Sequence, residues 1–97
     1  MFGNHITKQA RAKNFLTDSC TDEILFEVHR LNKDQEERFF EWLDQHLCEN
    51  NFNATDSSQD ERLRAWLNLQ STVLLLLEYQ IILEKVEHFR SNDEEKN

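Results

Sequence analysis

One stretch of the sequence, residues 58–89, restricts the fold more than any other. It contains neither glycine nor proline and is rich in Leu, Glu, Gln, Arg and Ala, which favour the α-helix. Ser58 is followed three residues later by Glu61, a spacing that fits a capping box at a helix start. The stretch therefore predicts one long C-terminal helix, over about residues 58–91, that is apolar on every side at Val73–Leu77.

Two apolar stripes run along this predicted helix when side chains are placed at about 100° per residue. The first consists of Leu63, Leu67, Gln70, Leu74, Leu77 and Ile81, with Trp66 and Val73 beside it. The second consists of Leu75, Tyr79, Ile82, Val86 and Phe89. Each alternates steps of three and four, which is typical of a helix packed on another helix. The stripes lie roughly 120° apart, so the two halves of the helix are expected to pack in different directions.

The length of the predicted helix points to a second chain. About 32 residues at 1.5 Å each span about 48 Å, whereas a compact domain of this size is about 32 Å across. We therefore expect the first stripe to cover the protein's own helices. The second stripe would contact another chain, most simply a second copy in a homodimer. The alternative is a helix that kinks, or is shorter, in a monomeric bundle.

Composition supports an all-α fold. A chain of 97 residues makes a single domain, residues 1–97, and is small enough that an oligomer contact would help to stabilise it. One glycine and no proline argue against β-hairpins and sandwiches, which need turn residues. The fold class predicted is a small helical bundle of three to four helices with one long C-terminal helix, extended by dimerisation.

Charge is distributed unevenly along the chain, whose net charge is −8. Residues 1–16 carry three basic and no acidic side chains, whereas residues 17–61 carry 13 acidic and three basic ones. An acidic chain repels phosphate, so direct binding of nucleic acid is not expected. The apolar run is too short for a membrane span and the first residues lack a signal-peptide pattern. We expect a cytoplasmic protein in which Cys20 and Cys48 are reduced.

The first half of the chain predicts two further helices. Residues 1–16 would form a loosely attached basic segment with at most a short helix, and Thr17–Thr21 a linker rich in capping residues. A helix begins after Thr21, with an apolar face at Ile24, Leu25, Val28 and Leu31. Phe26 lies off that face, so it is either covered by a neighbouring element, left on the surface or a contact for a partner.

The second predicted helix covers Lys33–Asn50 and is capped by Asn32. Its core face consists of Phe39, Phe40, Trp42, Leu43 and Leu47. A polar loop follows, and Asn92 is expected to end the long helix, leaving residues 92–97 as a frayed acidic tail.

Acidic side chains form one row on this helix, and they are Asp34, Glu37, Glu41 and Asp44. Their functional interpretation is a surface for a basic partner protein. If the row continues through Glu49, Asp56, Asp60 and Glu61, it could mimic the phosphates of a nucleic acid, because helix neighbours lie about 5–6 Å apart. The alternative interpretation is a solvated face that keeps the protein soluble.

Patterns for catalysis or metal binding are weak. None of the four histidines has a glutamate three residues before it, and no HExxH motif is present. Glu84 and His88 could share a metal ion, but two ligands make a poor site. No cofactor, metal ligand or catalytic residue is predicted. The function expected is a non-catalytic protein–protein interaction module, a small acidic adaptor, regulator or inhibitor.

Two alternatives to this function stay open. The first is an acidic nucleic-acid mimic that inhibits a DNA- or RNA-handling complex by binding a basic nucleic-acid-binding protein. The second is a small enzyme whose site forms only in three dimensions.

Overall fold

The structure is a computed structural model that describes the backbone of residues 2–53 and 57–96 and the side chains of residues 11–53 and 57–91. Within these residues there are four helices and no strand: α1 (Phe2–Val28), α2 (Lys33–Glu49), α3 (Gln59–Leu69) and α4 (Thr72–Lys96). The prediction of an all-α helical bundle is confirmed.

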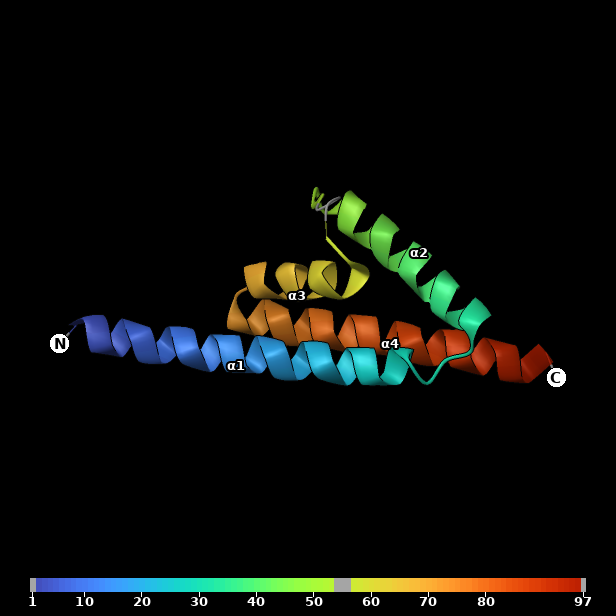
Figure 1. The fold of residues 1–97 in the computed structure, drawn as a ribbon, viewed down its shortest axis with the longest axis horizontal. Helices are drawn as coiled ribbons and strands as arrows, with labels where there is room; N and C mark the ends of the chain where they lie inside the picture. The colour runs from blue at the N-terminus through green and yellow to red at the C-terminus, as the bar shows by residue number, and fades with distance from the viewer. Residues whose placement is uncertain (1, 54–56, 97) are drawn as a thin grey trace.

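The bundle is built along a pair of parallel helices (Figure 1). α1 and α4 lie side by side and run in the same direction, and each extends past the other at one end. α3 runs back along α4, and α2 crosses above α4 at an oblique angle. The radius of gyration is 15.1 Å and the molecule measures 59 × 23 × 19 Å, whereas a compact domain of this length has a radius near 12.5 Å. The staggered pairing of α1 with α4 therefore makes the molecule elongated.

α1 is one continuous helix, so the linker expected at Thr17–Thr21 is wrong. Both threonines are buried inside the helix. The Thr17 hydroxyl donates to the carbonyl oxygen of Lys13 at 3.0 Å, and the Thr21 hydroxyl to that of Thr17 at 2.7 Å. Because each hydroxyl bonds one turn back, the residues can stay helical instead of capping a new helix. The side chains of residues 1–10, which belong to the expected basic segment, lie outside the described residues.

α2 agrees with its prediction, because its capping signal is local. The Asn32 side chain accepts from the amide of Gln35 at 2.9 Å, and the Gln35 side chain accepts from the amide of Asn32 at 2.9 Å. This reciprocal pair is a capping box. After the helix, Asn51 adopts a positive φ of 62°, a conformation that asparagine tolerates and that terminates helices.

The single long C-terminal helix is wrong, because the chain breaks between α3 and α4. Gln70 is extended, with φ −80° and ψ 150°. Ser71 then starts α4, since its hydroxyl accepts from the amide of Leu74 at 3.4 Å. The expected cap at Ser58 is present, accepting from the amide of Glu61 at 3.2 Å. A shorter helix, the alternative considered from the sequence, is therefore observed, and it continues to Lys96 rather than ending at Asn92.

The core lies where the four helices meet, and its side chains come from each of them. Its buried hydrophobic members among the described residues are Cys20, Ile24, Val28, Leu31, Phe39, Phe40, Leu43, Leu47, Leu63, Trp66, Leu67, Leu75, Ile82 and Val86. The core faces predicted for the first half of the chain are thus buried, apart from Leu25 and Trp42, which pack against the core while partly exposed.

Candidate interaction surfaces

The stripe predicted to meet a second chain lies inside the subunit instead. Leu75, Ile82 and Val86 are all 0% exposed, and Tyr79 and Phe89 are partly buried against the same core. The assignment of this stripe to a partner interface is therefore wrong for Leu75, Ile82 and Val86, whereas for the partly exposed Tyr79 and Phe89 it stays a prediction. The stripe is buried because α1 of the same chain is long and packs along α4 (Figure 1).

Exposed apolar side chains gather instead where α3 turns into α4. Five of the seven large hydrophobic side chains that are exposed among the described residues lie here, and we call them the apolar corner: Leu69 (67% exposed), Val73 (76%), Leu74 (48%), Leu76 (48%) and Leu77 (51%). Soluble monomers seldom expose contiguous apolar patches beyond ~300–600 Å², and such patches mark interaction sites. Five such side chains, exposed by about half to three quarters, together expose roughly several hundred square ångströms, which is comparable to the largest patch of a typical monomer, often a functional one.

The sequence identified part of the apolar corner but gave it the wrong role. Leu74 and Leu77 belong to the first stripe, which was expected to face the protein's own helices. Leu63 and Leu67 of that stripe are buried, but the break at Gln70 rotates the later members away from the core. The signal that could have revealed this is the Ser71–Thr72 pair, which can cap a new helix.

A mainly apolar hollow of about 350 Å³ continues this surface along α4, lined by Tyr79, Gln80, Leu83, Glu84 and Glu87. Burial, together with a hydrogen bond to Glu23 of α1, raises the pKa of Tyr79 to about 12. The phenol therefore stays neutral and ties α4 to α1 at the edge of the hollow.

A partly buried polar cluster joins α2 and α3 to α4. Glu78 Oε1 accepts a hydrogen bond from Trp66 Nε1 at 2.8 Å and lies 2.8 Å from His46 Nε2. The His46 ring stacks on Trp42, with centroids 5.0 Å apart and planes at 11°. One carboxylate thus contacts two other helices, which makes this part of α4 a structural hub rather than a binding site.

The far end of α4 is fastened to α1 by an ion pair. Arg90 Nη2 lies 2.8 Å from Glu27 Oε1, and Arg90 Nη1 lies 2.8 Å from Glu87 Oε1. The hydrogen bond from Arg90 lowers the pKa of Glu27, with a further contribution from Arg30. This pair keeps the parallel helices in register.

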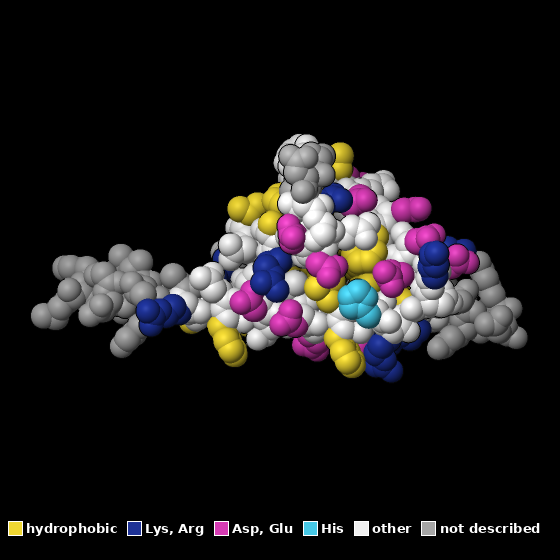
Figure 2. Space-filling view, in the orientation of Figure 1, with side chains coloured by type: hydrophobic (Ala, Val, Ile, Leu, Met, Phe, Trp, Pro, Cys, Tyr) yellow, Lys and Arg dark blue, Asp and Glu magenta, His cyan; other side chains and the backbone are white. Residues whose placement is uncertain are grey.

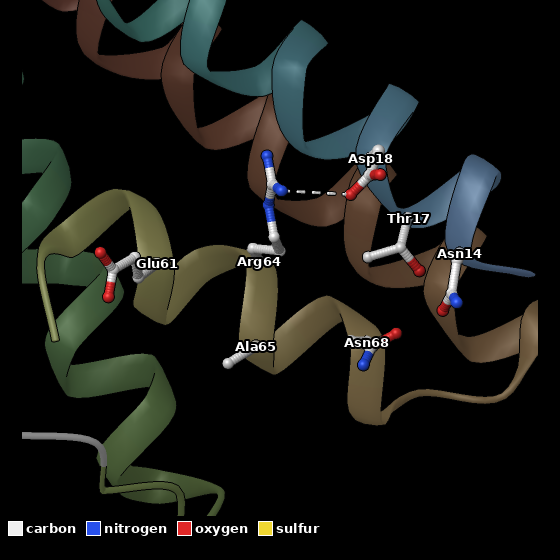
Figure 3. Close-up of a pocket in the computed structure, with 7 residues that line it drawn as sticks. All are labelled: Asn14, Thr17, Asp18, Glu61, Arg64, Ala65 and Asn68. Carbon is white, nitrogen blue, oxygen red and sulfur yellow. Dashed lines mark ion pairs between the residues drawn. The ribbon is translucent and has the colours of Figure 1, made fainter.

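A polar groove of about 380 Å³ separates α1 from α3 (Figure 3), and its lining includes Asn14, Asp18, Arg64 and Asn68. Arg64 crosses it, with Nη1 at 3.4 Å from Asp18 Oδ1. Next to the groove, Lys13 Nζ donates to the carbonyl oxygen of Asn68 at 2.9 Å. These contacts fasten α3 to α1, so the groove is explained as a polar contact between helices.

The acidic row is only partly available to a partner. Asp44 forms an ion pair with Arg62 at 2.6 Å, whereas Asp34, Glu37 and Glu41 are exposed. A hollow of about 240 Å³ lies along the row and is lined by Glu36, Glu37, Phe40, Glu41, Asp44 and Gln59. Figure 2 shows acidic side chains spread over α2 with basic ones among them. Asp56, through which the row was expected to continue, lies outside the described residues.

Phe26, the candidate exposed contact, is 63% exposed, with the Arg30 guanidinium 5.8 Å from its ring centroid. Phe15, which sequence analysis did not single out, is 75% exposed. The two are 11 residues apart, or about three helical turns, so they share the face of α1 opposite the core. The sequence analysis missed this face because it predicted a linker between Phe15 and Phe26, whereas α1 is continuous there.

Within the described side chains, no group of three or more His, Cys, Asp or Glu is placed to hold a metal ion. Cys20 is buried and Cys48 exposed, and neither forms a disulfide; burial raises the pKa of the Cys20 thiol. No described helix has both the length and the apolar character needed to cross a membrane. No protein-family model, curated protein or solved structure matches this chain.

Proposed function

We propose that this chain is a non-catalytic protein–protein interaction module that binds its partner through the apolar corner. The observation that supports the proposal most is the exposure of Val73 (76%) and its leucine neighbours, whereas Leu75, Ile82 and Val86 on the opposite face of α4 are fully buried. Burial of apolar surface contributes roughly 25 cal/mol per Å², so covering this patch would supply a substantial part of a binding energy.

The support of the corner by the rest of the fold favours a rigid binding surface. Glu78 anchors α2 and α3 to α4, and Tyr79 anchors α4 to α1. A surface held from both sides loses little conformational entropy when it binds, which favours affinity. The module would thus present a preformed helical surface rather than a segment that folds on binding.

This proposal is tested by charge substitution at the corner of the full-length chain. Val73→Glu and Leu77→Glu are each compared with wild type and with Phe15→Glu, which alters an equally exposed apolar side chain on another surface. Proteins retained from a cell extract by wild type are purified and their affinities measured, a second copy of the chain included. We expect both corner variants to weaken binding by about tenfold or more.

Circular dichroism must show that both corner variants remain as helical as wild type. Undiminished binding by both of them, or an equal loss in Phe15→Glu, would contradict the proposal.

The acidic row supports a second candidate function, the binding of a basic protein as a nucleic-acid mimic. The feature in its favour is the hollow that Glu37 and Glu41 line above Phe40. Under this function Glu37→Lys combined with Glu41→Lys abolishes competition with nucleic acid for a purified basic partner, and added salt weakens that competition in wild type. Competition that survives the double substitution would exclude this use of the row.

A further inference from the structure

We infer that the occupant of the apolar corner is a second copy of this chain, bound with the two α4 helices antiparallel. The inference rests on the proposed function and names its partner. It follows from three properties of the same helix face: its self-complementary shape, its charge and its area.

The shape of the α4 face suits pairing with itself. In a two-fold dimer the same surface is used by both copies, so a projecting region must lie opposite a recessed one. If the two-fold axis passes between Leu76 and Leu77, Val73 of one copy falls opposite Gln80 of the other. Val73 is 76% exposed, whereas Gln80, also exposed, lines the mainly apolar hollow together with Tyr79. The corner of each copy would thus fill the hollow of the other.

The charges on either side of this contact are opposite. By the helix rise, Thr72 lies about 7 Å from the proposed axis and Glu84 about 11 Å on the other side. Glu84 of the second copy would therefore extend about 4 Å past the start of the first copy's α4. The first copy's α1 continues past that point (Figure 1). Lys13 of α1 shares a groove with Thr72 at this point.

This arrangement brings an acidic segment to a basic one. Glu84 and Glu87 are both exposed on α4, and the basic side chain of Lys13 lies beside the start of α4. A parallel pairing would instead bring Glu84 of the two copies together, which like charges disfavour. Charge therefore selects the antiparallel orientation.

The area available also fits a dimer. A specific interface buries about 800 Å² on each partner. The several hundred square ångströms of the apolar corner fall short of this on their own. The mainly apolar hollow enlarges the contact toward that area, and the flanking charged side chains form the polar rim that surrounds the apolar centre of protein interfaces.

Sedimentation equilibrium of the full-length chain tests the identity of the partner. We expect wild type to approach twice the 11.7 kDa of one chain as its concentration rises through the micromolar range. Leu76→Glu should remain at the mass of one chain over the same range with an unchanged helical spectrum. Phe15→Glu, the control, should associate like wild type.

The orientation is tested by disulfide trapping in a Cys48→Ser background, which removes the exposed thiol and leaves the buried Cys20. A mixture of Val73→Cys and Gln80→Cys chains should cross-link under mild oxidation, because facing residues approach within disulfide reach. Neither variant should cross-link efficiently alone. Rapid self-cross-linking of Val73→Cys would show parallel pairing and overturn the proposed orientation.

Charge exchange provides an independent test of the same orientation. Glu84→Arg should weaken the dimer by up to about fivefold at low salt, as expected for an exposed ion pair. Adding Lys13→Glu to the same chain should restore the affinity, since Lys13 lies beside Thr72 at the end of α4 that Glu84 of the other copy would reach. Failure of the double variant to recover would overturn this pairing.

The failure of this inference can be told apart from failure of the proposed function. A wild-type chain that stays at 11.7 kDa at high concentration overturns the second copy as occupant. If the corner variants nevertheless fail to bind a different purified protein that wild type binds, the proposed function stands and only the inference is wrong. If they lose nothing, both the inference and the proposed function are wrong.

Discussion

The two faces of α4 are built from the same residue types, yet they have opposite roles. Ile82 and Val86 are completely buried against α1 and the other helices, whereas Val73 and Leu77, one to three turns earlier, are mostly exposed. Hydropathy alone does not separate them. The difference arises from whether each side chain points toward α1, a helix that ends at Val28, far earlier in the sequence, or away from it.

This comparison shows that an apolar stripe indicates packing without identifying the packing partner. Both stripes of the C-terminal region have the spacing of helix contacts. One is covered within the chain, and part of the other is left open, because the helix breaks at Gln70 within that stripe. A surface for a partner is therefore found only after the intramolecular neighbours are known.

The largest expected change in stability comes from shortening one side chain on each face of α4. Ile82→Ala removes a fully buried side chain and should lower the free energy of unfolding by about 2–5 kcal/mol. Leu76→Ala removes a side chain that is 48% exposed and should change it by no more than about 0.5 kcal/mol at concentrations where the chain is monomeric. Urea denaturation of both variants measures the difference, and similar losses would show that the two faces are equally buried.

The polar hub on the covered side of α4 should give the next largest effect. Glu78→Leu leaves Trp66 Nε1 and His46 without their shared acceptor, which should cost about 1–3 kcal/mol. Glu41→Leu, on an exposed acidic position of α2, serves as the matched control and should be nearly neutral. If denaturation gave equal stabilities for the two variants, Glu78 would contribute no more than a surface carboxylate.

Local signals explain which parts of this architecture the sequence could predict. The start of α2 was predictable because Asn32 and Gln35 satisfy each other within one turn. The buried face of α2 follows from its own periodicity. Whether Thr17 and Ser71 continue a helix or start a new one was not predictable in this way. A hydroxyl side chain can either bond back to the preceding turn of a helix or cap a new helix. The choice depends on tertiary packing, which buries Thr17 and leaves Ser71 exposed.

The candidate site was less predictable than the fold for the same reason. The acidic row was visible in the sequence, but the ion pair between Asp44 and Arg62 joins segments separated by a loop. Likewise, the exposure of Leu74 depends on the break at Gln70 and on the position of α1. Whether a side chain is exposed depends on the positions of all the neighbouring helices, and these positions follow only from the whole fold.

A smaller effect tests the two hydroxyl residues directly. Ser71→Ala removes the cap of α4 and should lower the free energy of unfolding by about 0.5–2 kcal/mol. Thr17→Val keeps the shape of a buried side chain and removes only a bond to a carbonyl that the helix itself can satisfy. We expect Thr17→Val to cost less than Ser71→Ala in urea denaturation. If Thr17→Val cost more than Ser71→Ala, the hydroxyl of Thr17 would contribute more to stability than the cap at Ser71.

The smallest effect concerns the ion pair that fastens the end of α4 to α1. Arg90 lowers the pKa of Glu27 below its usual value of 4.5. A carboxylate with a lowered pKa stabilises the fold above its unfolded-state pKa, and this contribution is lost as pH falls through the folded-state pKa. The stability difference between wild type and Glu27→Gln should therefore be constant near neutral pH and shrink as the pH falls below about 4.5. Because the pair is near the surface, high salt should reduce the difference as well. A difference that grew on acidification would show that Glu27 is protonated in the folded chain and does not bind Arg90 as an anion.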